Sequence, residues 1–146
     1  MAKFEEDLER GKEVEKMVLS LIRKKHESAV LIPGKFKPYD LYIPEINTKI
    51  EIKYDPMSNE TGNIVVEIEM GGKDSGLTTT EADWWIFCDD NVLAYITPKQ
   101  IMKCIFDCKL TYRVWTGPGD TQPKKAFLVR KNELFEYAAK TVKLNG

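Results

Sequence analysis

The sequence predicts an α+β fold of the α/β sandwich type, in which helices flank a central mixed β-sheet. Two patterns predict it: apolar residues recur at helical spacing near the N-terminus, and apolar and polar residues alternate through the middle of the chain. The chain has 146 residues and contains no internal repeat or interdomain linker. We therefore expect one domain that spans 1–146.

The N-terminal third predicts a helix, a strand and a hairpin. A helix is expected over 4–26, because its apolar residues share one face. These residues are Val14, Val18, Leu21 and Ile22. The apolar run 28–32 predicts a strand, and two prolines and a glycine make 33–38 a loop. Two alternating stretches on either side of 44–47 predict a β-hairpin over 39–54.

The middle of the chain predicts further strands. One strand is expected over 63–69, and Thr80 is expected to cap a single helical turn over 80–83. Two apolar runs, 84–88 and 92–96, predict a second hairpin. The expected loops are 55–62 and 71–79.

The C-terminal third predicts two helices and two more extended segments. Proline in the first turn predicts a helix over 98–109, and Asn132 is expected to cap a last helix that runs to about Val142. The expected extended segments are 111–115 and 126–129, with a loop at 117–125.

Composition excludes several classes of protein. No apolar run approaches the roughly 20 residues that span a bilayer, so no membrane partner is expected. The acidic, polar start of the chain is unlike a signal peptide, and three cysteines form no disulfide framework. These features predict a cytoplasmic protein with reduced thiols. The net charge of −1 counts against DNA binding, which usually needs a basic excess.

The first hairpin separates two faces when paired residue numbers sum to 91. One face is then apolar, and it comprises Tyr39, Leu41, Ile43, Ile50, Ile52 and Tyr54. The other is polar, and it comprises Asp40, Tyr42, Lys49, Glu51 and Lys53. A slip by one residue would mix the two faces, so the clean separation supports this register.

In this register Asp40 lies directly opposite Glu51, with Cβ atoms roughly 4.5–5.5 Å apart. Facing carboxylates repel each other unless a hard cation such as Mg²⁺ joins them. Lys53 points the same way as Glu51, where its ammonium can stabilise charge on a phosphate. The alternative is a charged hairpin face that is merely solvated.

These residues resemble the PD-(D/E)xK nuclease superfamily. The motif reads Pro38-Tyr39-Asp40 and then Glu51-Ile52-Lys53, with Tyr39 inserted between proline and aspartate. The resemblance covers residues 1 to about 90. It implies a restriction-endonuclease-like core and a DNA endonuclease that needs Mg²⁺, for which Mn²⁺ substitutes. It also implies that Asp40, Glu51 and the Ile52 carbonyl hold the metal, while Lys53 positions or activates water.

Two further segments are similar to particular members of the superfamily. The stretch from Arg10 to Glu15 looks like the opening of archaeal Holliday-junction resolvases, which implies Glu15 as a further catalytic carboxylate, a homodimer and branched DNA as substrate. A solvated helix edge is the alternative for Glu15. The stretch from Ser75 to Trp84 resembles phage-type members and implies a phage or mobile-element source.

Several other residues are candidates for contacts with DNA or metal. Lys35 and Lys37 precede Asp40 on a loop, and hydroxyls of Ser75 and Thr79 are suited to phosphates. A second basic cluster comprises Lys124, Lys125, Arg130 and Lys131. Glu67 and Glu69 are open alternatives for completing the metal site. A general or nicking nuclease, and an inactive nuclease fold that binds DNA or protein, remain as alternative functions.

Overall fold

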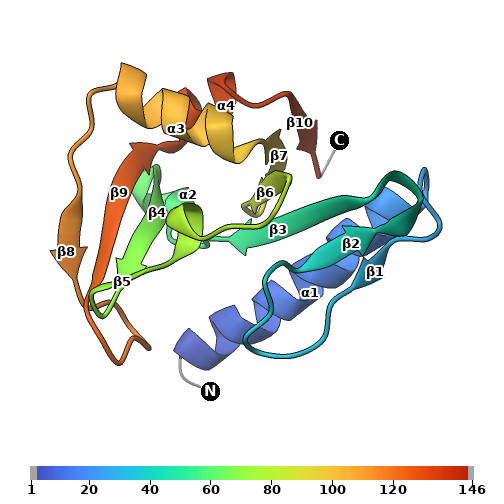
Figure 1. Ribbon diagram of the computed structural model, residues 1–146, viewed down its shortest axis with the longest axis horizontal. Helices are drawn as coiled ribbons and strands as arrows, with labels where there is room; N and C mark the ends of the chain where they lie inside the picture. Colours follow the sequence, from blue (N-terminus) through green and yellow to red (C-terminus); the bar gives the residue numbers. More distant parts are fainter. Residues whose placement is uncertain (1–2, 145–146) are drawn as a thin grey trace.

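The computed structural model describes residues 3–144, so residues 1–2 and 145–146 of the expected domain lie outside it. Two β-sheets and a set of helices form the described part (Figure 1). The helices are α1 (Lys3–Arg23), α2 (Ser58–Thr61), α3 (Pro98–Asp107) and α4 (Lys131–Glu136), with 3-10 turns η1 (Pro44–Ile46) and η2 (Gly76–Thr78). Within residues 3–144, no helix has the length and apolarity needed to cross a membrane.

The larger sheet has six strands in the order β1-β2-β3-β6-β7-β10. Their bounds are β1 (Val30–Leu31), β2 (Leu41–Ile43), β3 (Thr48–Tyr54), β6 (Trp84–Cys88), β7 (Val92–Ile96) and β10 (Lys140–Lys143). β3 and β6 run parallel, whereas the other neighbours are antiparallel. The predicted mixed sheet and both predicted hairpins are therefore confirmed.

The second sheet has four strands in the order β5-β4-β9-β8, and the sequence did not predict it. Its strands are β4 (Asn63–Met70), β5 (Lys73–Asp74), β8 (Arg113–Trp115) and β9 (Lys124–Arg130). In β4, Ile64 and Val66 are buried while Val65 between them is exposed. The buried face of β4 packs against β6 of the first sheet and against α3. The second sheet is therefore a separate layer beside the first.

The core lies on both faces of the six-stranded sheet. On one face, Ile86 and Cys88 pack with α1, whereas on the other Trp85 and Phe87 pack with the second sheet and α3. Consecutive residues of a strand point to opposite faces, so β6 is apolar throughout because both of its faces are covered. Figure 1 shows α1 along the lower right of the molecule and α3 with α4 along its top.

Several of the predicted local structures are wrong, including the expected loop 71–79, which contains β5 and η2. Thr80 caps no helical turn; its Oγ1 accepts hydrogen bonds from Trp85 Nε1 at 2.9 Å and from Ala82 N at 3.2 Å. The expected loop 55–62 contains α2, whose C-cap is Gly62 in the left-handed region (φ 74°). The last helix ends at Glu136 rather than near Val142, and Asn132 lies inside α4 instead of capping it. Residues 140–143 form β10 instead, because they pair with the edge of β7 that would otherwise be free.

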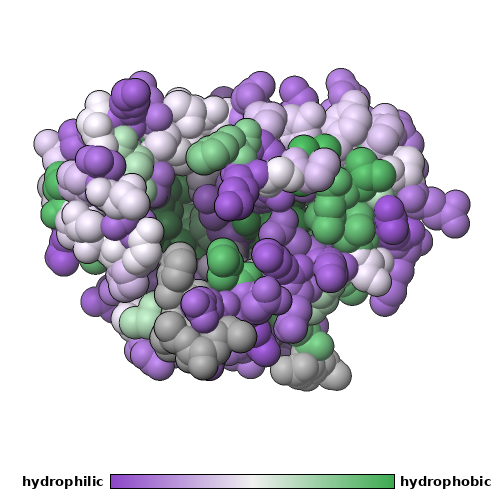
Figure 2. All heavy atoms as spheres, turned by 90° about the horizontal axis from the view of Figure 1, so that it is seen from below, coloured by the Kyte–Doolittle hydropathy of each residue, from purple (hydrophilic) through white to green (hydrophobic). Residues whose placement is uncertain are grey.

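The surface mixes polar and apolar residues. Seen from below (Figure 2), hydrophilic residues cover much of the face, and an apolar patch lies toward the right. Figure 1 places β1 and the C-terminal half of α1 at that end of the molecule. Val30 of β1 and Ile46 of η1 are both exposed. Apolar atoms make up much of any protein surface, so single exposed residues of this kind are ordinary.

Candidate active site

The β2–β3 hairpin has the predicted register. Its pairs are Leu41↔Ile50, Tyr42↔Lys49 and Ile43↔Thr48, each summing to 91. Leu41, Ile43, Ile50 and Ile52 of the apolar face are buried against α1. The chain reverses through η1 and Asn47, whose φ of 47° is in the left-handed region that asparagine tolerates.

The hydrogen-bond ladder between β2 and β3 becomes irregular at Asp40, the first acidic residue of the predicted motif. The Asp40 amide donates to the Ile50 carbonyl at 2.9 Å, although Ile50 is already paired with Leu41. Asp40 and Leu41 thus both face Ile50, and two residues opposite one is the arrangement of a β-bulge. The expectation that Asp40 lies directly opposite Glu51 is therefore wrong in register. Tyr39 is also displaced from the α1 face: its ring centroid is 6.1 Å from that of Tyr42.

The bulge turns the Asp40 side chain toward the edge of β3. Asp40 Oδ2 accepts a hydrogen bond from Ile52 N at 2.7 Å, taking the place of a neighbouring strand, since β2 pairs no further than Ile50. The N–H and C=O of one strand residue point to the same edge, so the Ile52 carbonyl faces this edge as well. A carboxylate and a backbone carbonyl are thereby held side by side.

Glu51 brings a second carboxylate close to Asp40. Burial raises the pKa of Glu51; Lys53 opposes the shift, and the adjacent Asp40 carboxylate adds to it. Lys53 Nζ lies 3.1 Å from Glu51 Oε2 and 5.4 Å from the centre of the Trp85 ring. The structure therefore brings together the three residues of the predicted motif.

Lys37 joins this group to α1. Its Nζ lies 3.2 Å from Glu15 Oε1, 3.5 Å from Asp40 Oδ1 and 3.1 Å from the Ile32 carbonyl oxygen. Burial lowers the pKa of Lys37, but the two carboxylates outweigh this effect and raise the pKa above its ordinary value. The predicted edge residue Glu15 thus reaches Asp40 through Lys37. The sequence did not reveal this bridging role.

The other candidate carboxylates and hydroxyls have partners elsewhere. Glu67 accepts a hydrogen bond from Ser75 Oγ at 2.7 Å, and Glu69 pairs with Lys125 at 2.7 Å in the second sheet. Ser75 also caps η2. Lys35 and Thr79 are exposed. Glu67 and Glu69 therefore have partners in or beside the second sheet, whereas Glu15 is joined to Asp40 through Lys37.

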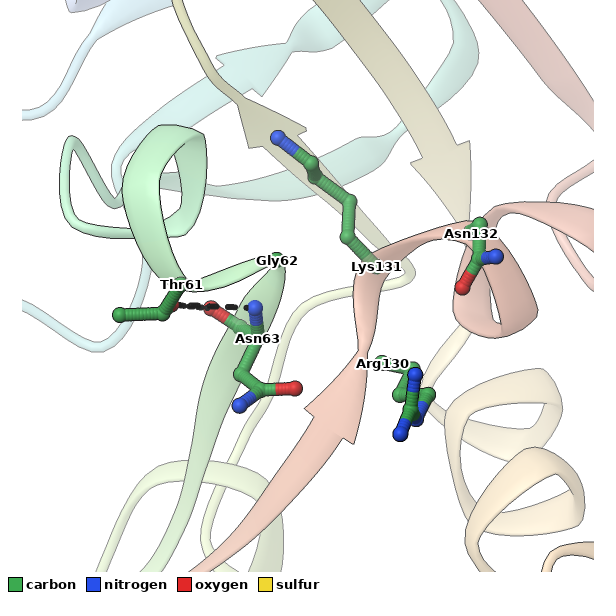
Figure 3. Close-up of a pocket in the computed structure, with 6 residues that line it drawn as sticks. All are labelled: Thr61, Gly62, Asn63, Arg130, Lys131 and Asn132. Atoms are coloured by element: carbon green, nitrogen blue, oxygen red, sulfur yellow. Dashed lines mark hydrogen bonds between the residues drawn. The ribbon is translucent and has the colours of Figure 1, made fainter.

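The second basic cluster is largely neutralised. Lys124 pairs with Asp120 and Lys131 with Asp89, at 3.0 and 2.7 Å. A polar pocket of about 310 Å³ lies where β4 begins and β9 ends (Figure 3). In Figure 3 the side chains of Arg130 and Lys131 extend in opposite directions, so they do not form one basic surface.

The donor set fits Mg²⁺ in part. Within residues 3–144, no three or more His, Cys, Asp and Glu side chains are gathered in a way that could hold a metal ion. Mg²⁺ nevertheless binds through one or two carboxylates and fills its other positions with water and phosphate. Asp40, Glu51 and the Ile52 carbonyl supply that smaller set.

The raised pKa of Glu51 gives a stability prediction. Because the folded protein holds this proton more tightly than the unfolded chain does, the contribution of Glu51 to stability should fall as the pH rises through the folded pKa. In EDTA, Glu51→Gln should therefore melt a few degrees higher than wild type at pH 7 to 8. This gain in melting temperature should disappear below pH 4.5, the ordinary pKa of a glutamate. The lost attraction to Lys53 matters less, because that ammonium is 43% exposed and screened by water.

Thermal unfolding across pH 4 to 8 measures this effect. Glu13→Gln, at an exposed position on α1, is the matched control and should show no pH-dependent gain. If Glu51→Gln is less stable than wild type by the same amount at every pH, the assignment of burial as the dominant cause is wrong.

Comparison of the chain with protein-family models, with curated proteins and with solved structures found no match.

Proposed function

We propose that this chain is a deoxyribonuclease that uses a divalent metal ion to hydrolyse phosphodiester bonds. The observation that carries the proposal is the meeting of Asp40, Glu51 and Lys53 at the free edge of β3. Two carboxylates held close together repel each other and destabilise the fold, so the pair indicates a functional role rather than a structural one. A hard cation bound between them supplies that reason.

Each residue then has a role. Asp40, Glu51 and the Ile52 carbonyl would hold Mg²⁺ or Mn²⁺, and Glu15 would help to orient Asp40 through Lys37. When bound, the ion polarises the phosphate and makes its bound water a better nucleophile. Lys53 places an ammonium beside Glu51, where it stabilises negative charge that develops on the phosphate. The water oxygen bonds to phosphorus as the bond to the leaving sugar oxygen breaks.

The finer substrate assignment rests on resemblance. Branched DNA and a homodimer with two symmetric sites form one version, whereas a general or nicking nuclease forms another. Both versions use the same residues, so the site alone does not separate them.

The test is cleavage of end-labelled DNA by the wild-type protein. A four-way junction, a linear duplex and a single strand of matched sequence are incubated with Mg²⁺, Mn²⁺ or EDTA. Cleavage with either metal and none in EDTA supports the proposal, and paired cuts in the junction alone support the homodimeric resolvase version. If no substrate is cut with either metal, the proposal of nuclease activity is wrong.

A further inference from the structure

The loop that leads into the site presents an aromatic ring to solvent. Phe36 is 102% exposed, so its ring packs against none of the residues that the structure describes. The next residue, Lys37, is anchored to Glu15 and Asp40. Consecutive Cα atoms are 3.8 Å apart, so Phe36 and Asp40 can be separated by at most about 15 Å. The ring is thus tethered close to the proposed site.

The residues around Phe36 suit a nucleic acid. Lys35, which precedes it, is exposed, and the loop 33–38 contains no acidic residue. Single strands are commonly bound by aromatic rings that stack on bases, combined with cations that track the phosphates. A paired base inside a duplex has both faces covered by its neighbours. An exposed ring therefore gains a stacking contact only where a base is unpaired or displaced.

We propose that Phe36 stacks on an unpaired base beside the phosphate that is cut, so that the substrate class is DNA with an unstacked base rather than an intact duplex. This inference rests on the proposed nuclease function. The anchored Lys37 fixes the base of the loop, while the exposed Lys35 supplies a cation for the phosphate backbone. Phe36 then determines which DNA is bound near the site, whereas Asp40, Glu51 and Lys53 carry out the reaction.

Binding measurements test the stacking role separately from cleavage. Fluorescence anisotropy follows three labelled DNAs: a perfect duplex, the same duplex with one unpaired nucleotide, and a single strand. Titrations are run with Ca²⁺ in place of Mg²⁺ and in parallel with EDTA. Phe36→Ala should weaken binding of the two DNAs with unpaired bases by about 5- to 150-fold, the range given by loss of one base–aromatic stack. Binding to the perfect duplex should be nearly unchanged.

Matched variants make the result specific. Phe36→Trp keeps a stacking surface and should bind as the wild type does, whereas Phe36→Leu keeps an apolar group and should bind as weakly as Phe36→Ala. Phe106→Ala removes another exposed ring, 82% exposed on α3, and should have no effect.

Each contrary outcome is distinct. If Phe36→Ala binds all three DNAs as the wild type does, or weakens the perfect duplex equally, the inference is wrong while the nuclease function can stand. If Phe36→Leu retains full affinity, the ring offers an apolar contact rather than a stack, and the inference is again wrong. If the wild type binds no DNA in either condition, the inference and the proposed function both fail.

Discussion

Replacing Lys53 with alanine is expected to slow DNA cleavage by at least about 100-fold, the usual loss when one group that stabilises transition-state charge is removed. The Lys53 ammonium lies 3.1 Å from Glu51 Oε2, beside the position where the phosphate would bind. Its side chain is 43% exposed, so the substitution removes little packing and should leave the fold intact. The loss should therefore come from the reaction and not from unfolding.

Lys49→Ala is the matched control. Lys49 lies on the same strand and face, and its Nζ is 5.5 Å from the Tyr39 ring centroid, just as Lys53 Nζ is 5.4 Å from that of Trp85. Both variants lose a cation–π contact, but of the two lysines only Lys53 forms an ion pair with Glu51 among the described residues. Single-turnover cleavage, with melting temperature as a check on folding, should show a large loss for Lys53→Ala alone. Equal losses in the two variants would argue against a catalytic role for Lys53.

Asp89→Ala is expected to lower the free energy of unfolding by about 3 kcal/mol, the lower end of the cost of removing one partner of a buried ion pair, because the Lys131 side chain is 21% exposed. Asp89 is 5% exposed in the turn between β6 and β7. Its Oδ1 accepts hydrogen bonds from Asn91 N and Val92 N, and its Oδ2 binds Lys131 Nζ, each at 2.7 Å. The substitution leaves Lys131 and two turn amides without their acceptor.

The pH dependence of this loss has a definite sign. Burial raises the pKa of Asp89, but the hydrogen bonds from Lys131 and the two amides outweigh it and hold the pKa below 3.8. The contribution of Asp89 is therefore fully present above that ordinary value and is lost as the pH falls through the lower folded pKa. Urea unfolding at pH 7 and pH 3 measures it. Asp90→Ala, at the exposed neighbouring residue, should have a much smaller effect, and comparable losses in both variants would contradict the assignment.

The hairpin could be predicted from the sequence because the alternation that indicates it lies within one short segment. Strict alternation on both strands of 39–54 specifies one register, since any other register would expose the apolar residues Leu41 and Ile50. The bulge at Asp40 left no such pattern, because an extra residue in one strand is visible only when its partner is known. Asp40, Glu51 and Lys53 therefore lie close together as the hairpin predicts, while the pairing of Asp40 was described too regularly.

Features that depend on distant contacts were missed. Lys37 lies 22 residues from Glu15, and no spacing rule connects a loop lysine to a helical glutamate at that separation. The second sheet joins β4 to β9, which are far apart in the sequence. The same applies to β10, where pairing with β7 overrides a weak helical pattern.

Titration calorimetry with Mg²⁺ and Mn²⁺ tests most directly whether Asp40 and Glu51 form a metal site. Wild-type protein is expected to bind the ion, Glu51→Gln to lose that binding, and the exposed control Glu13→Gln to keep it. Absence of binding to the wild type, or binding that survives Glu51→Gln unchanged, would contradict the central claim that these two carboxylates are held together for a divalent cation.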